Sequence, residues 1–104
     1  MGLRSPNEAV AAFLVLGCTE NPRHSRKNYR WLELLDGQGH QKAIFNVPVA
    51  KDPIPIGTFV KSILNPNGIR DEVHLKELLE AEDPRAAFLA VLPEGGPRYR
   101  PHGH

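Results

Sequence analysis

Two aromatic residues follow a group of basic residues in this chain, and together they could hold a nucleic acid. Tyr29 and Trp31 are two positions apart, so on a β-strand both side chains would lie on the same face. Three cations stand just before them in the sequence: Arg23, Arg26 and Lys27. Aromatic rings stack on bases for about 1–3 kcal/mol each, and Arg and Lys pair with phosphates. The pattern is compatible with binding of a single strand.

A simpler interpretation of the same residues stays open. Tryptophan on a strand is a common core residue, because its ring buries a large apolar area. Basic residues in a loop are often only solvated, and they then contribute little to stability or binding. The direction of the Trp31 side chain therefore separates a binding face from an ordinary core.

Candidate catalytic residues do not form a recognisable set. The serines lack a G-x-S-x-G context, and neither H-E-x-x-H nor a phosphate-binding glycine loop occurs. The single Cys18 lies in an apolar stretch and is expected to be a buried, inert thiol. His102 and His104, separated only by Gly103, are weak evidence for a metal site. We expect a binding protein that is not an enzyme and has no cofactor or metal.

Length and composition predict one domain. The chain has 104 residues, of which 40% are hydrophobic and 24% charged, with a net charge of +1. We expect a folded domain over residues 1–94 and a flexible basic tail over residues 95–104. Residues 1–64 are mildly basic, whereas residues 69–94 are acidic. Neither a membrane-spanning run nor a secretory signal is evident, which predicts a cytoplasmic protein with no membrane partner.

A β-hairpin is the clearest local prediction. Residues 29–35 alternate between apolar and other side chains, and residues 40–47 form a second strand. Between them, the segment from Asp36 to Gly39 supplies turn residues that tolerate positive φ. The polar segment 20–28, which contains Pro22, is expected to be a long loop.

The remaining elements are predicted as follows. A short helix begins at Ser5 and gives way to a buried strand over residues 11–18. Another strand covers residues 58–64 and ends at the turn Asn65–Gly68. Residues 70–92 fit either strands or helices, with Asp71 and Asp83 as the helix caps in the second case.

This order of elements resembles the OB-fold, in particular its anticodon-binding and single-strand-binding types. The likeness covers roughly residues 9–75 and depends on the runs YRWLELLDGQGHQKAIF and GTFVKSILNPNG, which are similar to that family's second, third and fourth strands. The resemblance implies a mainly β fold, a small five-stranded barrel with one or two short helices. The Pro-rich segment 48–56 departs from the family, because a helix is usual there.

In such a barrel, four residues of the hairpin would point inward: Leu32, Leu34, Ala43 and Phe45. The outer face would then carry the nucleic acid, as it does in that family. The residues implied for this face are Arg23, Arg26, Lys27, Tyr29, Trp31, Lys42, Ile44, Phe59 and Lys61. We expect single-stranded DNA or RNA to bind there.

A second function fits the same barrel. The surface formed by Trp31, Ile44 and Leu35 could instead bury a protein partner or a second copy of the chain, with the acidic segment 71–83 facing outward. The protein would then be an assembly subunit of a larger complex. Steep loss of affinity with added salt would favour nucleic acid, and salt-insensitive association would favour protein.

Overall fold

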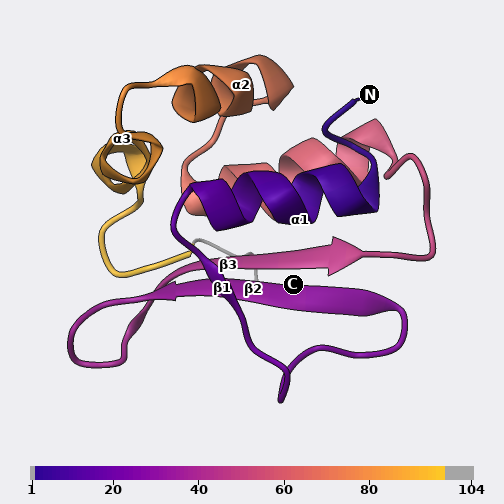
Figure 1. Ribbon diagram of the computed structural model, residues 1–104, viewed down its shortest axis with the longest axis horizontal. Coiled ribbons are helices and arrows are strands. Elements are labelled where there is room, and N and C mark those ends of the chain that lie inside the picture. Colours follow the sequence, from indigo (N-terminus) through magenta and orange to yellow (C-terminus); the bar gives the residue numbers. More distant parts are fainter. Residues whose placement is uncertain (1, 98–104) are drawn as a thin grey trace, which may run out of the picture.

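The computed structural model describes residues 2–97. A three-stranded antiparallel sheet contains β1 (Thr19–Glu20), β2 (Tyr29–Leu35) and β3 (Gln41–Pro48), in the order β1-β2-β3. Helix α1 (Pro6–Val15) runs along one face of this sheet, and all the other helices lie on that side as well (Figure 1). The opposite face has no helix among residues 2–97.

The predicted five-stranded barrel is therefore wrong. The sheet is open, has three strands among the described residues and is combined with several helices, so the fold is mixed α and β. Two of the predicted strands are helical. Residues 11–18 continue the first helix as far as Val15, and residues 58–64 form η1 (Thr58–Leu64), a wide π-helical segment.

The start of α1 was predicted, but its continuation over residues 11–15 was hidden in the sequence because the helix is apolar on both sides. Phe13 and Leu16 are fully buried against the sheet, whereas Leu14 and Val15 are exposed. Pro6 in the first turn and Glu8 near the N-terminus favour the helix start. Since almost every position after Glu8 is apolar, the helical period could not be seen in the sequence.

The hairpin prediction is confirmed. Strand β3 begins one residue later than expected, and Leu32 pairs with Phe45 across the sheet. Asp36 Oδ1 accepts hydrogen bonds from the backbone N–H of Gln38 (2.8 Å) and of His40 (2.9 Å), which fixes the turn. The four residues predicted to point inward, Leu32, Leu34, Ala43 and Phe45, are all buried under the helices.

A buried asparagine occupies the free edge of β3 where a further strand would pair. Asn67, in the short 3₁₀ turn η2 (Asn65–Asn67), is fully buried. Its Oδ1 accepts from the N–H of Ile44 (2.9 Å), and its Nδ2 donates to the carbonyl oxygens of Ile44 (2.7 Å) and Ile63 (2.9 Å). Through these bonds the Asn67 side chain pairs with buried backbone groups at this edge of the sheet.

The alternative that residues 70–92 left open is decided in favour of helices. Asp71 caps α2 (Glu72–Glu80) by accepting from the N–H of His74 at 2.8 Å. Asp83 caps α3 (Pro84–Val91) in the same way from Ala86 at 3.1 Å. Both bonds satisfy helix N-terminal donors, as the sequence suggested for the helical case.

The core fills the space between the sheet and the helices. Phe13 of α1 stacks on Phe45 of β3 with 3.8 Å between ring centroids, and Phe88 of α3 packs on Phe45 at 5.6 Å. The helices of the described chain are too short or too polar to cross a lipid bilayer. From residue 98 onward, the predicted tail lies outside the described residues.

Candidate nucleic-acid interface

The outer face of the sheet carries the aromatic residues singled out by the sequence. Leu32 and Leu34 point into the core, so their neighbours on β2, Tyr29, Trp31 and Glu33, project to the side without helices. Tyr29 and Trp31 are half-buried, in contrast to the fully buried Leu32. The Trp31 ring therefore lies on the open face and not among the leucines.

The loop over residues 21–28 is folded into two tight turns beside Trp31. Asn21 extends the pairing of β1, since its N–H donates to the carbonyl oxygen of Trp31 at 2.9 Å. Asn21 Oδ1 accepts from the N–H of Arg23 (3.0 Å), which closes the first turn. Arg26 and Tyr29 exchange backbone hydrogen bonds of 2.8 and 3.3 Å and close the second. These bonds fix the position of the basic loop relative to the sheet.

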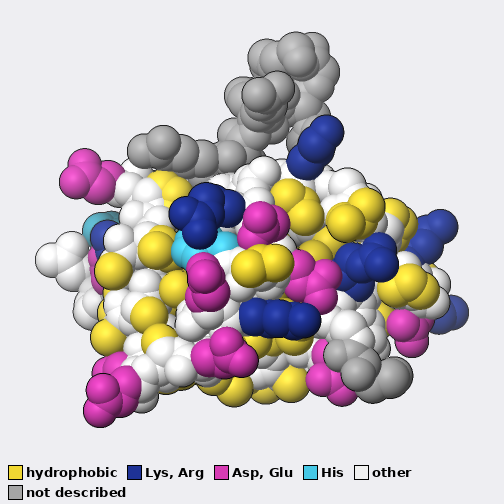
Figure 2. All heavy atoms as spheres, turned by 90° about the horizontal axis from the view of Figure 1, so that it is seen from above, with side chains coloured by type: hydrophobic (Ala, Val, Ile, Leu, Met, Phe, Trp, Pro, Cys, Tyr) yellow, Lys and Arg dark blue, Asp and Glu magenta, His cyan; other side chains and the backbone are white. Residues whose placement is uncertain are grey.

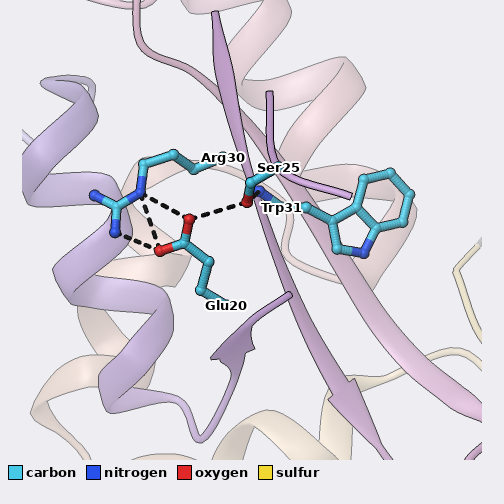
Figure 3. Close-up of polar contacts among 4 residues, drawn as sticks. All are labelled: Glu20, Ser25, Arg30 and Trp31. Atoms are coloured by element: carbon cyan, nitrogen blue, oxygen red, sulfur yellow. Dashed lines mark hydrogen bonds and ion pairs between the residues drawn. The ribbon is translucent and has the colours of Figure 1, made fainter. Parts of the chain in front are cut away.

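Side-chain hydrogen bonds also attach this loop to β2 (Figure 3). Ser25 Oγ accepts from the N–H of Trp31 (3.0 Å) and donates to Oε2 of Glu20 (2.9 Å). Arg30 Nε lies 3.2 Å from both carboxylate oxygens of Glu20. The hydrogen bond from Arg30 lowers the pKa of Glu20. Because Arg30 is paired with Glu20, it is not available to contact a phosphate.

A carboxylate holds the indole ring of Trp31 in place. Glu33 is only 6% exposed, and its Oε1 accepts from Trp31 Nε1 (2.9 Å) and Gln41 Nε2 (3.2 Å). Its Oε2 accepts from Asn21 Nδ2 at 3.0 Å. Burial alone would raise the pKa of Glu33, but the three hydrogen bonds, with a small contribution from His24, outweigh it, so the pKa is lowered.

His24 lies against the indole, with 5.0 Å between the two ring centroids and 44° between the planes. His24 is not among the nine residues that the sequence predicted for the interface. Its contact with Trp31 depends on the fold of the loop, and the Asn21-Pro22 pair, a turn signal, was the only local indication. The two rings and the exposed cations of the loop lie within one short, ordered region.

Of the nine residues predicted for the interface, five gather in this region: Arg23, Arg26, Lys27, Tyr29 and Trp31. The three cations are exposed and have no carboxylate within ion-pair distance in the described chain. Arg26 Nη1 donates to the carbonyl oxygens of Arg23 (2.9 Å) and Ser25 (3.1 Å), which holds its side chain along the loop.

The other four residues predicted for the interface lie outside the region formed by the basic loop and Trp31. Phe59 is fully buried in η1, and Lys61 is exposed on the same helix, on the opposite side of the sheet, so their assignment to the interface is corrected. Both were placed by a fourth strand that does not exist. Ile44 projects to the outer face but is buried.

Lys42 lies at the hairpin end of the sheet. The register shifts between Leu34 and Leu35, which leaves Lys42 without a cross-strand partner. Backbone hydrogen bonds from His40 and Gln38, with a smaller contribution from the charge of Lys42, lower the pKa of Asp36. Lys42 is therefore close to the turn and separate from the basic loop.

Burial raises the pKa of the Cys18 thiol to about 12, which makes it a poor nucleophile. Between residues 2 and 97, no three His, Cys, Asp or Glu side chains are grouped as a metal would require.

Neither protein-family models, nor curated proteins, nor solved structures give a match to this chain. The OB-fold resemblance gains no support from them. The functional interpretation therefore depends on the geometry of the loop and the sheet.

Proposed function

We propose that this protein binds single-stranded nucleic acid on the outer face of its sheet and on the adjoining basic loop. The observation that carries the proposal is the contact between His24 and Trp31, at 5.0 Å, beside a loop of exposed cations. Bases would stack on the two rings and on Tyr29, while phosphates would follow Arg23, Arg26 and Lys27. Aromatic platforms combined with basic grooves are the usual means of binding single strands without sequence readout.

Order in the site supports this function. Trp31 is held by Glu33 and the loop by Ser25 and Glu20, so little conformational freedom would be lost when a strand binds. One small site contacts few nucleotides, and binding beside a larger complex or as a dimer would raise the apparent affinity. We also propose that the protein is cytoplasmic.

The helix side of the molecule has a different character. Figure 2 shows that face with acidic and basic side chains interspersed and hydrophobic side chains between them. Such a surface lacks a region of one charge that would attract a phosphate backbone. This contrast favours the loop and the sheet as the nucleic-acid side.

A titration of the intrinsic tryptophan fluorescence tests the proposal, because Trp31 is the only tryptophan. Single strands of about 12 nucleotides, as DNA and as RNA, are added at about 50 mM and about 200 mM salt. We expect quenching of Trp31 and a marked loss of affinity at the higher salt. Absence of binding at the lower salt would refute the proposal.

A second candidate function is self-association through α1. Leu14 and Val15 are exposed on that helix, and apolar side chains from Leu3 and Leu79 lie beside it. The sheet surface first considered for a protein partner has less support, since Ile44 is buried. Sedimentation at several protein concentrations tests this candidate: association of two copies that is insensitive to salt would favour it.

A further inference from the structure

Asn46 of β3 is the direct cross-strand neighbour of Trp31. The N–H of Trp31 donates to Ser25 Oγ, and its carbonyl oxygen accepts from Asn21, so both backbone groups are turned away from β3. Trp31 and Asn46 therefore form a pair without mutual backbone hydrogen bonds. In such pairs the Cβ atoms are about 4.5–5.5 Å apart and the side chains are closest.

The amide of Asn46 is available for a ligand. Asn46 is exposed, and its side chain makes no hydrogen bond with the described chain. Two other amides on this side of the sheet are already committed, since Asn21 and Gln41 donate to Glu33. A free donor and a free acceptor thus lie beside the aromatic ring on which a base would stack.

We propose that Asn46 is a specificity-determining residue that recognises adenine stacked on Trp31. This inference rests on the proposed function and names the base that the same site prefers. An asparagine amide matches adenine in a bidentate manner, with Oδ1 accepting from the N6 amino group and Nδ2 donating to N7. Bases of a single strand present these edges freely, because they are not covered by a complementary strand.

The size of the base supports the same choice. A purine covers more of an indole ring than a pyrimidine does. Asn46 lies directly across from Trp31, on the neighbouring strand. Trp31 would supply affinity for any base, whereas Asn46 would supply the difference between bases.

The test adds dA, dC or dT homopolymers of about 12 nucleotides to the protein and follows binding by the quenching of Trp31 fluorescence. A good bidentate contact discriminates by roughly 5- to 150-fold. We expect the native protein to bind the dA strand more tightly than the dC and dT strands, by a factor within this range. Asn46→Ala should remove the preference for dA and leave binding of the dT strand nearly unchanged.

Two further variants sharpen the result. Asn7→Ala changes an exposed asparagine of α1, on the helix side, and should keep the native preference. Asn46→Asp keeps an acceptor but loses the donor, so its preference should move from dA toward dC, whose N4 amino group donates to a carboxylate. Because Asn46 is exposed, neither substitution at this position should disturb folding.

The outcomes separate the two proposals. Equal binding of all three strands by the native protein, or a dA preference that survives Asn46→Ala, would overturn the role of Asn46 and leave the proposed function standing. No binding of any strand at low salt would overturn both.

Discussion

The indole Nε1 of Trp31 donates a 2.9 Å hydrogen bond to Oε1 of Glu33, two residues further along the same face of β2. This bond joins the ring proposed to stack on bases to a nearly buried carboxylate. Glu33 in turn accepts from Asn21, at the start of the basic loop. One side chain thus connects the aromatic ring to the loop that carries the cations.

Replacement of Glu33 should show how much this connection contributes. In Glu33→Leu, the donors of Trp31, Gln41 and Asn21 lose their acceptor, and we expect a loss of about 1–3 kcal/mol in the free energy of unfolding. Urea denaturation measures this loss. Glu33→Gln keeps one acceptor oxygen and should lose less. Equal stability of Glu33→Leu and the native protein would contradict the structural role of the carboxylate.

The lowered pKa of Glu33 predicts a pH dependence of stability. A carboxyl whose pKa is lower in the folded than in the unfolded state stabilises the fold when it is ionised. This contribution is complete above the ordinary value of 4.5 and is lost as the pH falls below it, through the lowered folded-state pKa. Measured by urea denaturation, the free energy of unfolding should fall less steeply at acid pH in Glu33→Gln than in Glu80→Gln, an exposed control on α2. Identical declines would contradict the prediction.

Loop cations should determine the salt dependence of nucleic-acid binding. Removing three phosphate contacts from a single-strand complex lowers the magnitude of the slope of log affinity against log salt by about 2. We expect this change in the triple variant Arg23→Ala, Arg26→Ala, Lys27→Ala.

Lys61→Ala is the matched control for these cations. Lys61 is exposed but lies on η1, on the far side of the sheet. It should leave both the affinity and the salt slope as in the native protein. A reduced slope in Lys61→Ala, with none in the triple variant, would place the interface on the helix side.

Asn67 is predicted to be essential for closing the edge of β3. Asn67→Ala removes three hydrogen bonds and leaves buried backbone groups of Ile44 and Ile63 without these partners. We expect a destabilisation of about 3 kcal/mol, measured by thermal or urea unfolding. Asn7→Ala, at an exposed position, should change stability by less than about 0.5 kcal/mol. Similar values for the two variants would be inconsistent with the role given to Asn67.

Gly68 should tolerate no side chain. Its φ is +83°, and a Cβ there would lie 2.1 Å from the carbonyl oxygen of Val91. Gly68→Ala should therefore destabilise the protein by more than the roughly 1–2 kcal/mol of left-handed backbone strain alone. Gly57→Ala is the control, because Gly57 is helical and no atom lies within 4 Å of its would-be Cβ. Calorimetric melting of the two variants should differ clearly, and equal melting temperatures would contradict this account of Gly68.

The sequence predicted the hairpin and the direction of its side chains. Alternation over residues 29–35 and the turn at Asp36 are local signals, and they place Leu32 inside and Trp31 outside whether the sheet is open or closed. The barrel could not be derived in this way, since closure depends on what pairs with β3. Asn67 covers that edge through a contact between residues 23 positions apart, which no local pattern reveals.

The helical conformation of residues 11–15 and 58–64 was missed for a different reason. In η1, Phe59 and Ile63 are four residues apart and both buried, as on one side of a helix, but the run from Thr58 to Leu64 also has the β-branched and apolar residues of a strand. The candidate site also combines residues that local signals predict with one that they do not. Trp31 and the loop cations were found from their types and spacing, whereas His24 joined them only through the fold of the loop.

The central claim is tested most directly by titrating a single strand against the fluorescence of Trp31, with the native protein and Trp31→Ala compared by a second, label-based readout. We predict quenching of the native protein, weaker binding at higher salt, and a loss of roughly 5- to 150-fold in affinity in Trp31→Ala, equivalent to one stacked base. Failure of the native protein to bind at low salt, or equal affinity of the two proteins, would contradict the account.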